Sequence, residues 1–350
     1  MSKRKSFGHR IDSAWVKLKC RLMLPLRRDD FADALTIELT NRCTLACSCC
    51  PNGVDQTSFR PKQNMAGEHF ELLLERIDIP ISHVFLHLHG EPFLNNALPD
   101  MAERLKQRGV RQFSIFSNAY HIDLEILKRL LEKAKGCELQ LCFSAELYDR
   151  QVYERIRKPG HFETIWQSME TIDRLMSEYQ IGYSLNSIID SKAIDGLHTA
   201  VPDIFRRLRQ LNNIQFSSAF PWPHLPATGD IAGHLAPHRP ICAQIRQLPV
   251  VLASGEVSMC SSDYRGECIV GSLWEKPYSV LMNNRKALRF RRNIALRHPE
   301  RNQPCNDCLI DRHRAFSRTV RRIFIEKADE TAIKKYFSNY HQYFDIDNEA

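Results

Sequence analysis

The sequence predicts an α/β fold in which a parallel sheet curls into a partial (β/α)6 barrel, followed by a small C-terminal cluster-binding module. Two observations predict the barrel: six short strand-like runs recur between residues 34 and 220, and segments with apolar residues at helical spacing separate them. A third predicts the module, because cysteines return late in the chain after a stretch rich in Pro, Gly and His. The chain has 350 residues and is 43% hydrophobic, which is enough for one large core and a smaller module.

The expected strands cover residues 35–40, 83–90, 112–118, 138–144, 182–189 and 213–219. The clearest helical patterns lie between them, over residues 67–77, 98–109, 123–136 and 162–179. Side chains on a strand alternate between two faces, so the second strand should place four aromatic or histidine side chains on one face: His83, Phe85, His87 and His89. We expect this face to line the barrel interior and to form a cavity for a hydrophilic substrate, with four further inward side chains: Glu38, Asn118, Cys142 and Ser144.

The chain divides into four expected parts. Residues 34–220 form the barrel core, and residues 221–310 form a linker and the module. Residues 1–33 form a basic amphipathic segment, which we expect to cap the open barrel; docking on an anionic membrane surface is the alternative. Residues 311–350 form a helical tail. The chain shows neither a secretion signal nor a run long enough to cross a membrane, so we expect a cytoplasmic protein.

Four cysteines crowd the stretch "NRCTLACSCCPNG", directly after the first expected strand. Cys43, Cys47 and Cys50 have the spacing C-x3-C-x2-C. Three thiolates can hold three irons of a four-iron cluster and leave the fourth iron open to a small chelating ligand; a zinc site or redox thiols are the alternatives. The motif resembles that of the radical S-adenosylmethionine (radical SAM) enzymes. The resemblance implies a 4Fe-4S cluster whose open iron binds S-adenosylmethionine. Cys49 departs from the family, which commonly has an aromatic residue there near the adenine.

Later strand ends carry further parts of this resemblance. Gly90, Glu91 and Pro92 are similar to the family's GGEP motif, which holds the methionine amino group, although His89 replaces its first glycine. Four more residues are assigned contacts with S-adenosylmethionine by the resemblance: Asn118 after the third strand, Ser144 and Arg157 at the methionine carboxylate, and Asn186 at the ribose.

A second set of cysteines lies in the C-terminal module. Cys242, Cys260, Cys305 and Cys308 follow the pattern C-x12-G-x4-C and, after a long gap, C-x2-C. Four thiolates saturate a cluster or a zinc ion. The arrangement resembles the SPASM and Twitch modules of radical SAM enzymes, and the absence of further cysteines after Cys308 favours one auxiliary 4Fe-4S cluster, as in Twitch modules. Cys268 is an alternative ligand.

The resemblance implies an enzyme that generates a 5'-deoxyadenosyl radical and receives electrons from a partner such as flavodoxin or ferredoxin. We expect oxidation of a small sugar or aminocyclitol-like molecule, with the auxiliary cluster as electron acceptor and His87 or Glu38 as catalytic base. Peptide modification is one alternative. Epimerisation is another, with Cys142 or Cys268 as hydrogen donor. A nucleic-acid partner is not expected, because no motif of stacking aromatic residues accompanies the basic blocks.

Overall fold

The computed structural model describes residues 34–56, 59–188, 190, 196–217, 224, 249–295, 298 and 301–308. The expected N-terminal segment (1–33), most of the linker, Cys242 and the expected helical tail (311–350) lie outside the described residues. Within the described part, no helix is both long and apolar enough to span a bilayer.

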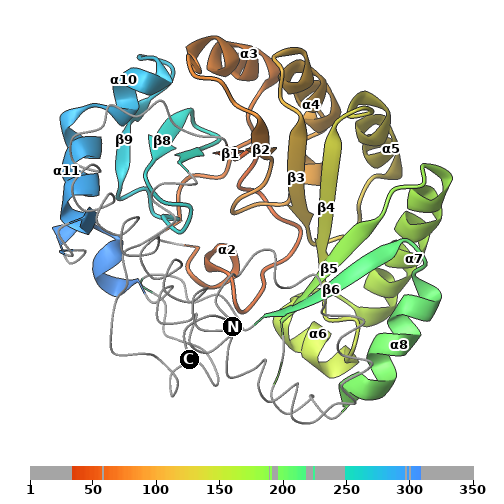
Figure 1. The fold of residues 1–350 in the computed structure, drawn as a ribbon. Coiled ribbons are helices and arrows are strands. Elements are labelled where there is room, and N and C mark those ends of the chain that lie inside the picture. Colours follow the sequence, from red (N-terminus) through yellow and green to blue (C-terminus); the bar gives the residue numbers. More distant parts are fainter. Residues whose placement is uncertain are drawn as a thin grey trace, which may run out of the picture.

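Six strands form the core: β1 (Ala34–Ile37), β2 (His83–Phe85), β3 (Gln112–Ser117), β4 (Glu138–Ser144), β5 (Tyr183–Ile188) and β6 (Leu211–Ser217). Each pairs in parallel with the next one along the chain. The strands follow an arc with β6 at one edge, and among the described residues β6 pairs with β5 alone (Figure 1). The sheet is therefore an open, partial barrel, as the sequence predicts.

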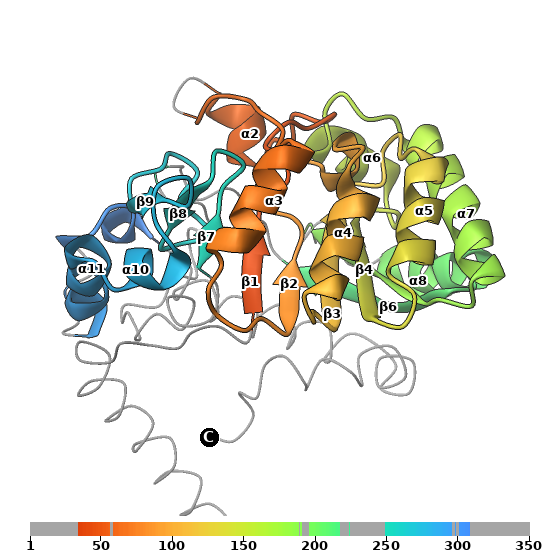
Figure 2. The ribbon, with the colours of Figure 1, turned by 90° about the horizontal axis from the view of Figure 1, so that it is seen from above.

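The core helices are α2 (Pro51–Val54), α3 (Gly67–Arg76), α4 (Leu98–Gln107), α5 (Leu124–Lys133), α6 (Arg150–Ile156), α7 (Phe162–Glu178) and α8 (Leu197–Arg207), with the short 3-10 helix η1 (Pro92–Leu94). Figure 2 shows α3, α4, α5 and α7 side by side along the outer surface. α2, α6 and α8 are not among the expected helices. α2 and α6 are too short to show a periodic pattern, and Pro202 interrupts that of α8.

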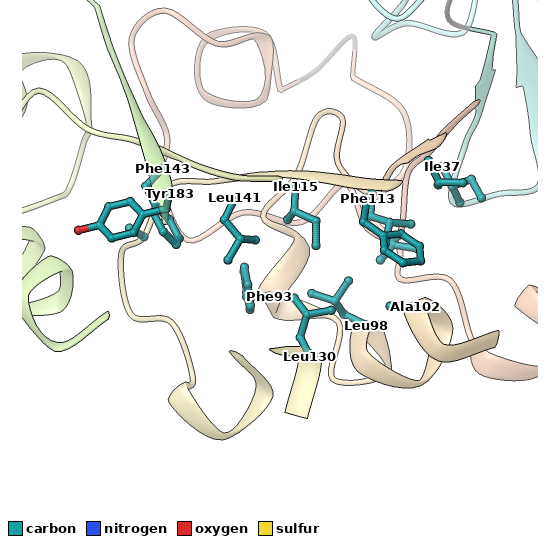
Figure 3. Packing of buried hydrophobic residues seen from close by; sticks show 14 of the residues in the cluster. Ile37, Phe93, Leu98, Ala102, Phe113, Ile115, Leu130, Leu141, Phe143 and Tyr183 are labelled. Atoms are coloured by element: carbon teal, nitrogen blue, oxygen red, sulfur yellow. The ribbon is translucent and has the colours of Figure 1, made fainter. Parts of the chain in front are cut away.

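The two faces of the sheet differ in polarity. Figure 3 shows Phe113, Ile115 and Leu141 pointing from the strands toward Leu98 and Leu130 of the helices. These side chains are almost fully buried, and the cross-strand register places residues of the opposite parity on the inner, concave face. The alternation that the sequence shows therefore separates an apolar helix-facing layer from the barrel interior.

The second strand is shorter than expected. Its ladder ends at Phe85 rather than continuing to residue 90. Leu86 N still donates to Ser114 O at 3.0 Å, but the chain then crosses the end of the sheet toward the cysteine loop. There Gly90 passes so close to the loop after β1 that a Cβ atom would meet Thr40 O at 2.4 Å and Arg42 O at 2.6 Å. The ladder of β2 ends because the chain contacts this neighbouring loop. The alternating side-chain pattern of the sequence does not predict such a contact.

The C-terminal module continues the barrel sheet. β7 (Val250–Val251) pairs in parallel with β1, and β8 (Glu256–Ser258) and β9 (Ile269–Ser272) extend it as antiparallel strands, so the described sheet has nine strands. α10 (Tyr278–Met282), α11 (Arg285–Ala295) and the 3-10 helix η5 (Cys305–Asp307) follow. The sequence predicts the module but not its attachment to the first strand.

Candidate active site

The cysteine motif forms a loop between β1 and α2, at the carboxyl end of the sheet where α/β folds place their chemistry. Cys50 is the N-cap of α2, Pro51 is its first residue, and Cys50 N donates to Cys47 O at 3.1 Å. Gly53 packs against the loop so tightly that a Cβ atom would meet Cys47 O at 2.4 Å. The spacing of Cys47 and Cys50 is thus set by one tight turn and the start of a helix.

Two side chains donate toward the thiols of this loop. Asn118 Nδ2 donates to Cys43 Sγ at 3.4 Å, and Arg157 Nη1 donates to Cys47 Sγ at 3.9 Å. Burial raises the pKa of Cys43 to about 11, so these thiols need a cation or donors to ionise. Hydrogen-bond donors aimed at the sulfur atoms fit thiolate ligands of an iron-sulfur cluster.

Arg157 is held in place by Glu146. Its Nε and Nη2 atoms donate to the two Glu146 carboxylate oxygens at 2.9 and 2.8 Å, and the Glu146 side chain is fully buried. Glu146 lies two residues beyond Ser144, so the alternation that selects Ser144 also points to it; the sequence analysis missed this residue. The pair aims the remaining Arg157 nitrogen at the cysteine loop.

The loop of Gly90, Glu91 and Pro92 lies against the cysteine loop, with Glu91 N donating to Arg42 O at 2.8 Å. The Glu91 carboxylate is buried and accepts from Phe93 N at 3.2 Å and from Asn118 N at 2.7 Å. Burial raises its pKa to about 7. The structure thus brings Glu91 and Asn118 together beside Cys43, where a carboxylate can pair with an amine.

Ser144 and Asn186 lie opposite each other where β4 and β5 end, and both are half-buried. Ser217 Oγ on β6 donates to Asn186 Oδ1 at 3.3 Å. The two residues therefore line the same carboxyl end as the cysteine loop, but among the described residues neither side chain is hydrogen-bonded to a cysteine thiol.

The two proposed bases have different surroundings. Glu38 accepts from Arg60 Nη1 and Nη2 at 2.9 and 2.8 Å and from Ala253 N at 3.1 Å. Burial alone would raise the pKa of Glu38, but hydrogen bonds from His89 and Arg60 lower it to about 2. Both oxygens are engaged, which favours a structural role: Glu38 joins β1 to the C-terminal module.

His87 keeps one nitrogen available. Its Nδ1 lies 3.2 Å from the Ser114 carbonyl oxygen, which can only accept, so Nδ1 carries the proton and Nε2 is the basic atom. Burial lowers the pKa of His87 to about 4. The ring packs against Phe85 and Phe116 on the concave face. His87 is therefore neutral near pH 7 and can accept a proton from a group in the barrel.

Neutral polar side chains line the rest of the concave face. In the cross-strand register Ser114 lies opposite Gln140, Cys142 opposite Ser184, and Asn186 opposite Gln215. Within strands β2 to β6, the acidic residue on this face is Glu138, at the far, amino end of β4. Glu38 and Glu146, beyond the ends of β1 and β4, are paired with Arg60 and Arg157. The face offers hydroxyl, amide and imidazole groups to a substrate.

In the C-terminal module, Cys260, Cys305 and Cys308 are half-buried, and Cys242 lies outside the described residues. Ser262 N donates to Cys260 Sγ at 3.4 Å. The buried Ser262 hydroxyl has no hydrogen-bond partner among the described residues. A sulfur-rich group at Cys260 would supply the acceptor that this hydroxyl lacks, so these residues fit an iron-sulfur cluster.

Cys268 differs from these three. Its thiol donates to Asp263 Oδ2 at 3.1 Å and lies 3.2 Å from Ser258 Oγ, and all three side chains are buried. Burial and the adjacent Asp263 carboxylate raise the pKa of Cys268 well above its ordinary value. Asp263, which the sequence analysis missed, thus keeps Cys268 protonated and favours the ligand set without it.

No group of three or more His, Cys, Asp or Glu side chains among the described residues converges closely enough to hold a single metal ion. Thiols that surround a four-iron cluster lie farther apart than ligands of one ion.

Comparison with known families decides the identity of this site. Residues 37–184 match the family model of the radical SAM superfamily, and residues 242–309 match SPASM, an iron-sulfur cluster-binding domain. This chain belongs to the radical SAM superfamily. Its radical SAM core implies a 4Fe-4S cluster with S-adenosylmethionine, and its SPASM module implies auxiliary iron-sulfur binding. A search of curated proteins gave no match.

Solved radical SAM structures share the fold. BtrN in complex with AdoMet and 2-DOIA has a TM-score of 0.53 at 18% identity, covering 80% of this chain and 94% of that chain. Native anSMEcpe with bound AdoMet has a TM-score of 0.60 at 14% identity, covering 87% and 99%. Streptococcus suis SuiB bound to precursor peptide SuiA has a TM-score of 0.58 at 12% identity, covering 81% and 71%. At these identities the likeness concerns the fold.

Proposed function

We propose that this radical SAM enzyme oxidises a hydroxyl-bearing small molecule, of the sugar or aminocyclitol type, to a ketone. The observation that carries the proposal is the concave face, which combines the basic Nε2 atom of His87 with neutral hydroxyl and amide side chains on the neighbouring strands β3 to β6. Such groups bind a polyol through many hydrogen bonds. The likeness of fold to BtrN, solved with a small molecule bound, supports the same class of substrate.

Each group of the proposed site residues has a separate role. Cys43, Cys47 and Cys50 would hold the first cluster, with Glu91 and Asn118 at the methionine amine, Arg157 and Ser144 at its carboxylate, and Asn186 at the ribose. Cys242, Cys260, Cys305 and Cys308 would hold the auxiliary cluster. When bound, the cofactors supply a 5'-deoxyadenosyl radical that takes one hydrogen atom from the substrate carbon and an acceptor for one electron. His87 Nε2 takes the hydroxyl proton, which completes the loss of two hydrogens and leaves a C=O bond.

Epimerisation, a redox-neutral reaction, is the second candidate function, because the barrel interior holds a thiol that could donate a hydrogen atom. Cys142 lies on the concave face, opposite Phe116 and Ser184, and burial raises its pKa to about 12. A thiol that stays protonated inside the barrel can return a hydrogen atom to a substrate radical and so invert a stereocentre; the thiyl radical left behind would need one proton and one electron, of which the auxiliary cluster would supply the electron when bound. Cys268, the other candidate donor, is bonded to Asp263 in the SPASM module instead.

The test is product analysis with a panel of polyols, aminocyclitols and peptides in D2O. We expect a ketone and 5'-deoxyadenosine in equal amounts from a hydroxyl substrate. His87→Gln should lower ketone formation about a hundredfold or more while 5'-deoxyadenosine still forms. His83→Gln is the matched control, since His83 bonds Ser114 Oγ at the amino end of β2.

Other products would contradict the proposal. A deuterated epimer that disappears in Cys142→Ser would establish hydrogen return by the thiol. A cross-linked peptide would establish peptide modification. Full ketone yield from His87→Gln would remove His87 from the base role.

A further inference from the structure

α11 carries the most concentrated positive charge in the described part of the SPASM module. Arg285, Lys286, Arg289 and Arg292 are exposed, and α11 contains no acidic residue. Arg285, Arg289 and Arg292 are spaced at i, i+4 and i+7 and so form one stripe. None of these four side chains makes an ion pair with a described residue, whereas most exposed arginines on the core helices do, as Arg104 does with Glu71.

The opposite face of α11 fastens the helix to the module. Ala287, Phe290 and Ile294 are buried, and the buried Arg291 donates from Nη2 to Met282 O at 2.7 Å. The apolar side of the helix is therefore covered, and the basic stripe points outward. Figures 1 and 2 both place α11 at the edge of the molecule, away from the barrel.

α11 is also joined directly to the C-x2-C pair. The buried Asn302 donates from Nδ2 to Phe290 O at 3.0 Å and accepts from Asn293 Nδ2 at 2.8 Å. Asn302 O in turn accepts from Asn306 N at 3.2 Å, between Cys305 and Cys308. The blue ribbon of residues 301–308 lies beside α11 in Figure 1. A molecule on the basic stripe would therefore lie near the auxiliary cysteines.

We propose that the basic stripe of α11 is the docking surface for an acidic one-electron carrier protein of the flavodoxin or ferredoxin type, which removes the electron from the auxiliary cluster. The inference rests on the proposed oxidation, because each turnover leaves one electron there. One electron then passes to the oxidised carrier, and no bond forms or breaks. A positive stripe attracts and orients an acidic partner.

Other anionic partners fit the stripe less well. Single-stranded nucleic acid is bound by aromatic side chains interleaved with the basic ones, but Phe290, the aromatic residue of α11, is buried. An interfacial membrane helix needs an apolar face for the lipid, but that face of α11 is packed against the module.

The test compares two charge-reversal triples in the reconstituted full chain. Arg285→Glu, Arg289→Glu and Arg292→Glu together change the net charge by six, from +8 to +2. The control triple, Lys128→Glu, Lys135→Glu and Arg174→Glu, makes the same change at exposed core residues. Binding of oxidised flavodoxin is measured by calorimetry at several salt concentrations, and its reduction by the pre-reduced enzyme by stopped-flow absorbance.

We expect the α11 triple to weaken binding and slow flavodoxin reduction about tenfold or more, with the control triple close to wild type. 5'-Deoxyadenosine formation with dithionite and ketone formation with a small chemical oxidant should remain in the α11 triple, so failure of docking is distinct from failure of the proposed oxidation. Equal weakening in both triples, or in neither, would overturn the proposal. So would loss of binding to a DNA strand or to anionic lipid vesicles by the α11 triple while flavodoxin binding persists.

Discussion

Neighbouring groups decide which cysteines of the SPASM module can ligate iron. Cys260 Sγ accepts from a backbone N–H, while the Cys268 thiol donates to the Asp263 carboxylate. A ligand must be a thiolate, which donors stabilise and an adjacent carboxylate opposes. The surroundings of Cys260 thus favour a thiolate, and those of Cys268 favour a protonated thiol. The spacing in the sequence does not separate the two and leaves both as candidate iron ligands.

Cys268→Ser is therefore expected to keep the auxiliary cluster. The serine hydroxyl can still donate to Asp263, so the buried carboxylate keeps its hydrogen bond. Cys260→Ser should lose the cluster, since it removes a proposed ligand. The measurement is iron per chain and the EPR spectrum of the reduced protein. Loss of iron in Cys268→Ser, with Cys260→Ser unaffected, would reverse the assignment.

At the scale of elements, a contact joins the two cysteine-bearing loops. Asp55, which ends α2, accepts from Tyr264 Oη at 2.7 Å and from Arg265 Nη2 at 2.8 Å. Tyr264 is almost fully buried and stacks on Phe59 with ring centroids 6.0 Å apart. Asp55 lies five residues after the proposed ligand Cys50, and Tyr264 lies four residues after the proposed ligand Cys260. Movement of one loop must therefore disturb the other.

Removal of the Tyr264 hydroxyl should loosen both loops. Tyr264→Phe loses one buried hydrogen bond, which contributes about 1 kcal/mol and corresponds to about fivefold faster local opening. Hydrogen-deuterium exchange of peptides covering residues 43–56 and 259–268 in the holoprotein measures this. Tyr278→Phe is the matched control, because the buried Tyr278 hydroxyl has no hydrogen-bond partner among the described residues. Unchanged exchange at residues 43–56 in Tyr264→Phe would show that the loops open independently.

At the scale of the whole molecule, one sheet connects the radical SAM core to the SPASM module. β7 pairs with β1, and Glu38 at the end of β1 accepts from Ala253 N beyond β7. The two proposed clusters are therefore held by one continuous body, which suits transfer of an electron from a substrate in the barrel to the module.

Removal of the proposed auxiliary ligands should separate formation of 5'-deoxyadenosine from oxidation of the substrate. We expect the wild-type protein to bind about eight irons, and Cys305→Ala with Cys308→Ala to bind about half as many. That variant should still form 5'-deoxyadenosine with dithionite, because the first cluster is intact, but it should yield no ketone. Cys49→Ala, outside the spacing of the motif, should keep both clusters and is the control. A normal ketone yield without auxiliary iron would exclude electron transfer to the module.

The sequence alone determines the radical SAM core, because strand alternation and a local cysteine motif depend on residues close together in the chain. β4 covers the expected residues 138–144, and the open barrel follows from six strand and helix repeats. Cys43, Cys47 and Cys50 can be identified without coordinates, since they lie within eight consecutive residues and a single turn joins the last two.

Only the tertiary structure decides what the polar side chains do, because charge pairs and hydrogen bonds join residues far apart in sequence. Arg60 and Ala253 donate hydrogen bonds to Glu38, the Ser114 carbonyl fixes the proton on His87 Nδ1, and the Asp263 carboxylate keeps the Cys268 thiol protonated. The same alternation selects Glu38 and His87 as inward residues. Their pKa values then move to about 2 and about 4 for different reasons, the partners of Glu38 in one case and burial of His87 in the other.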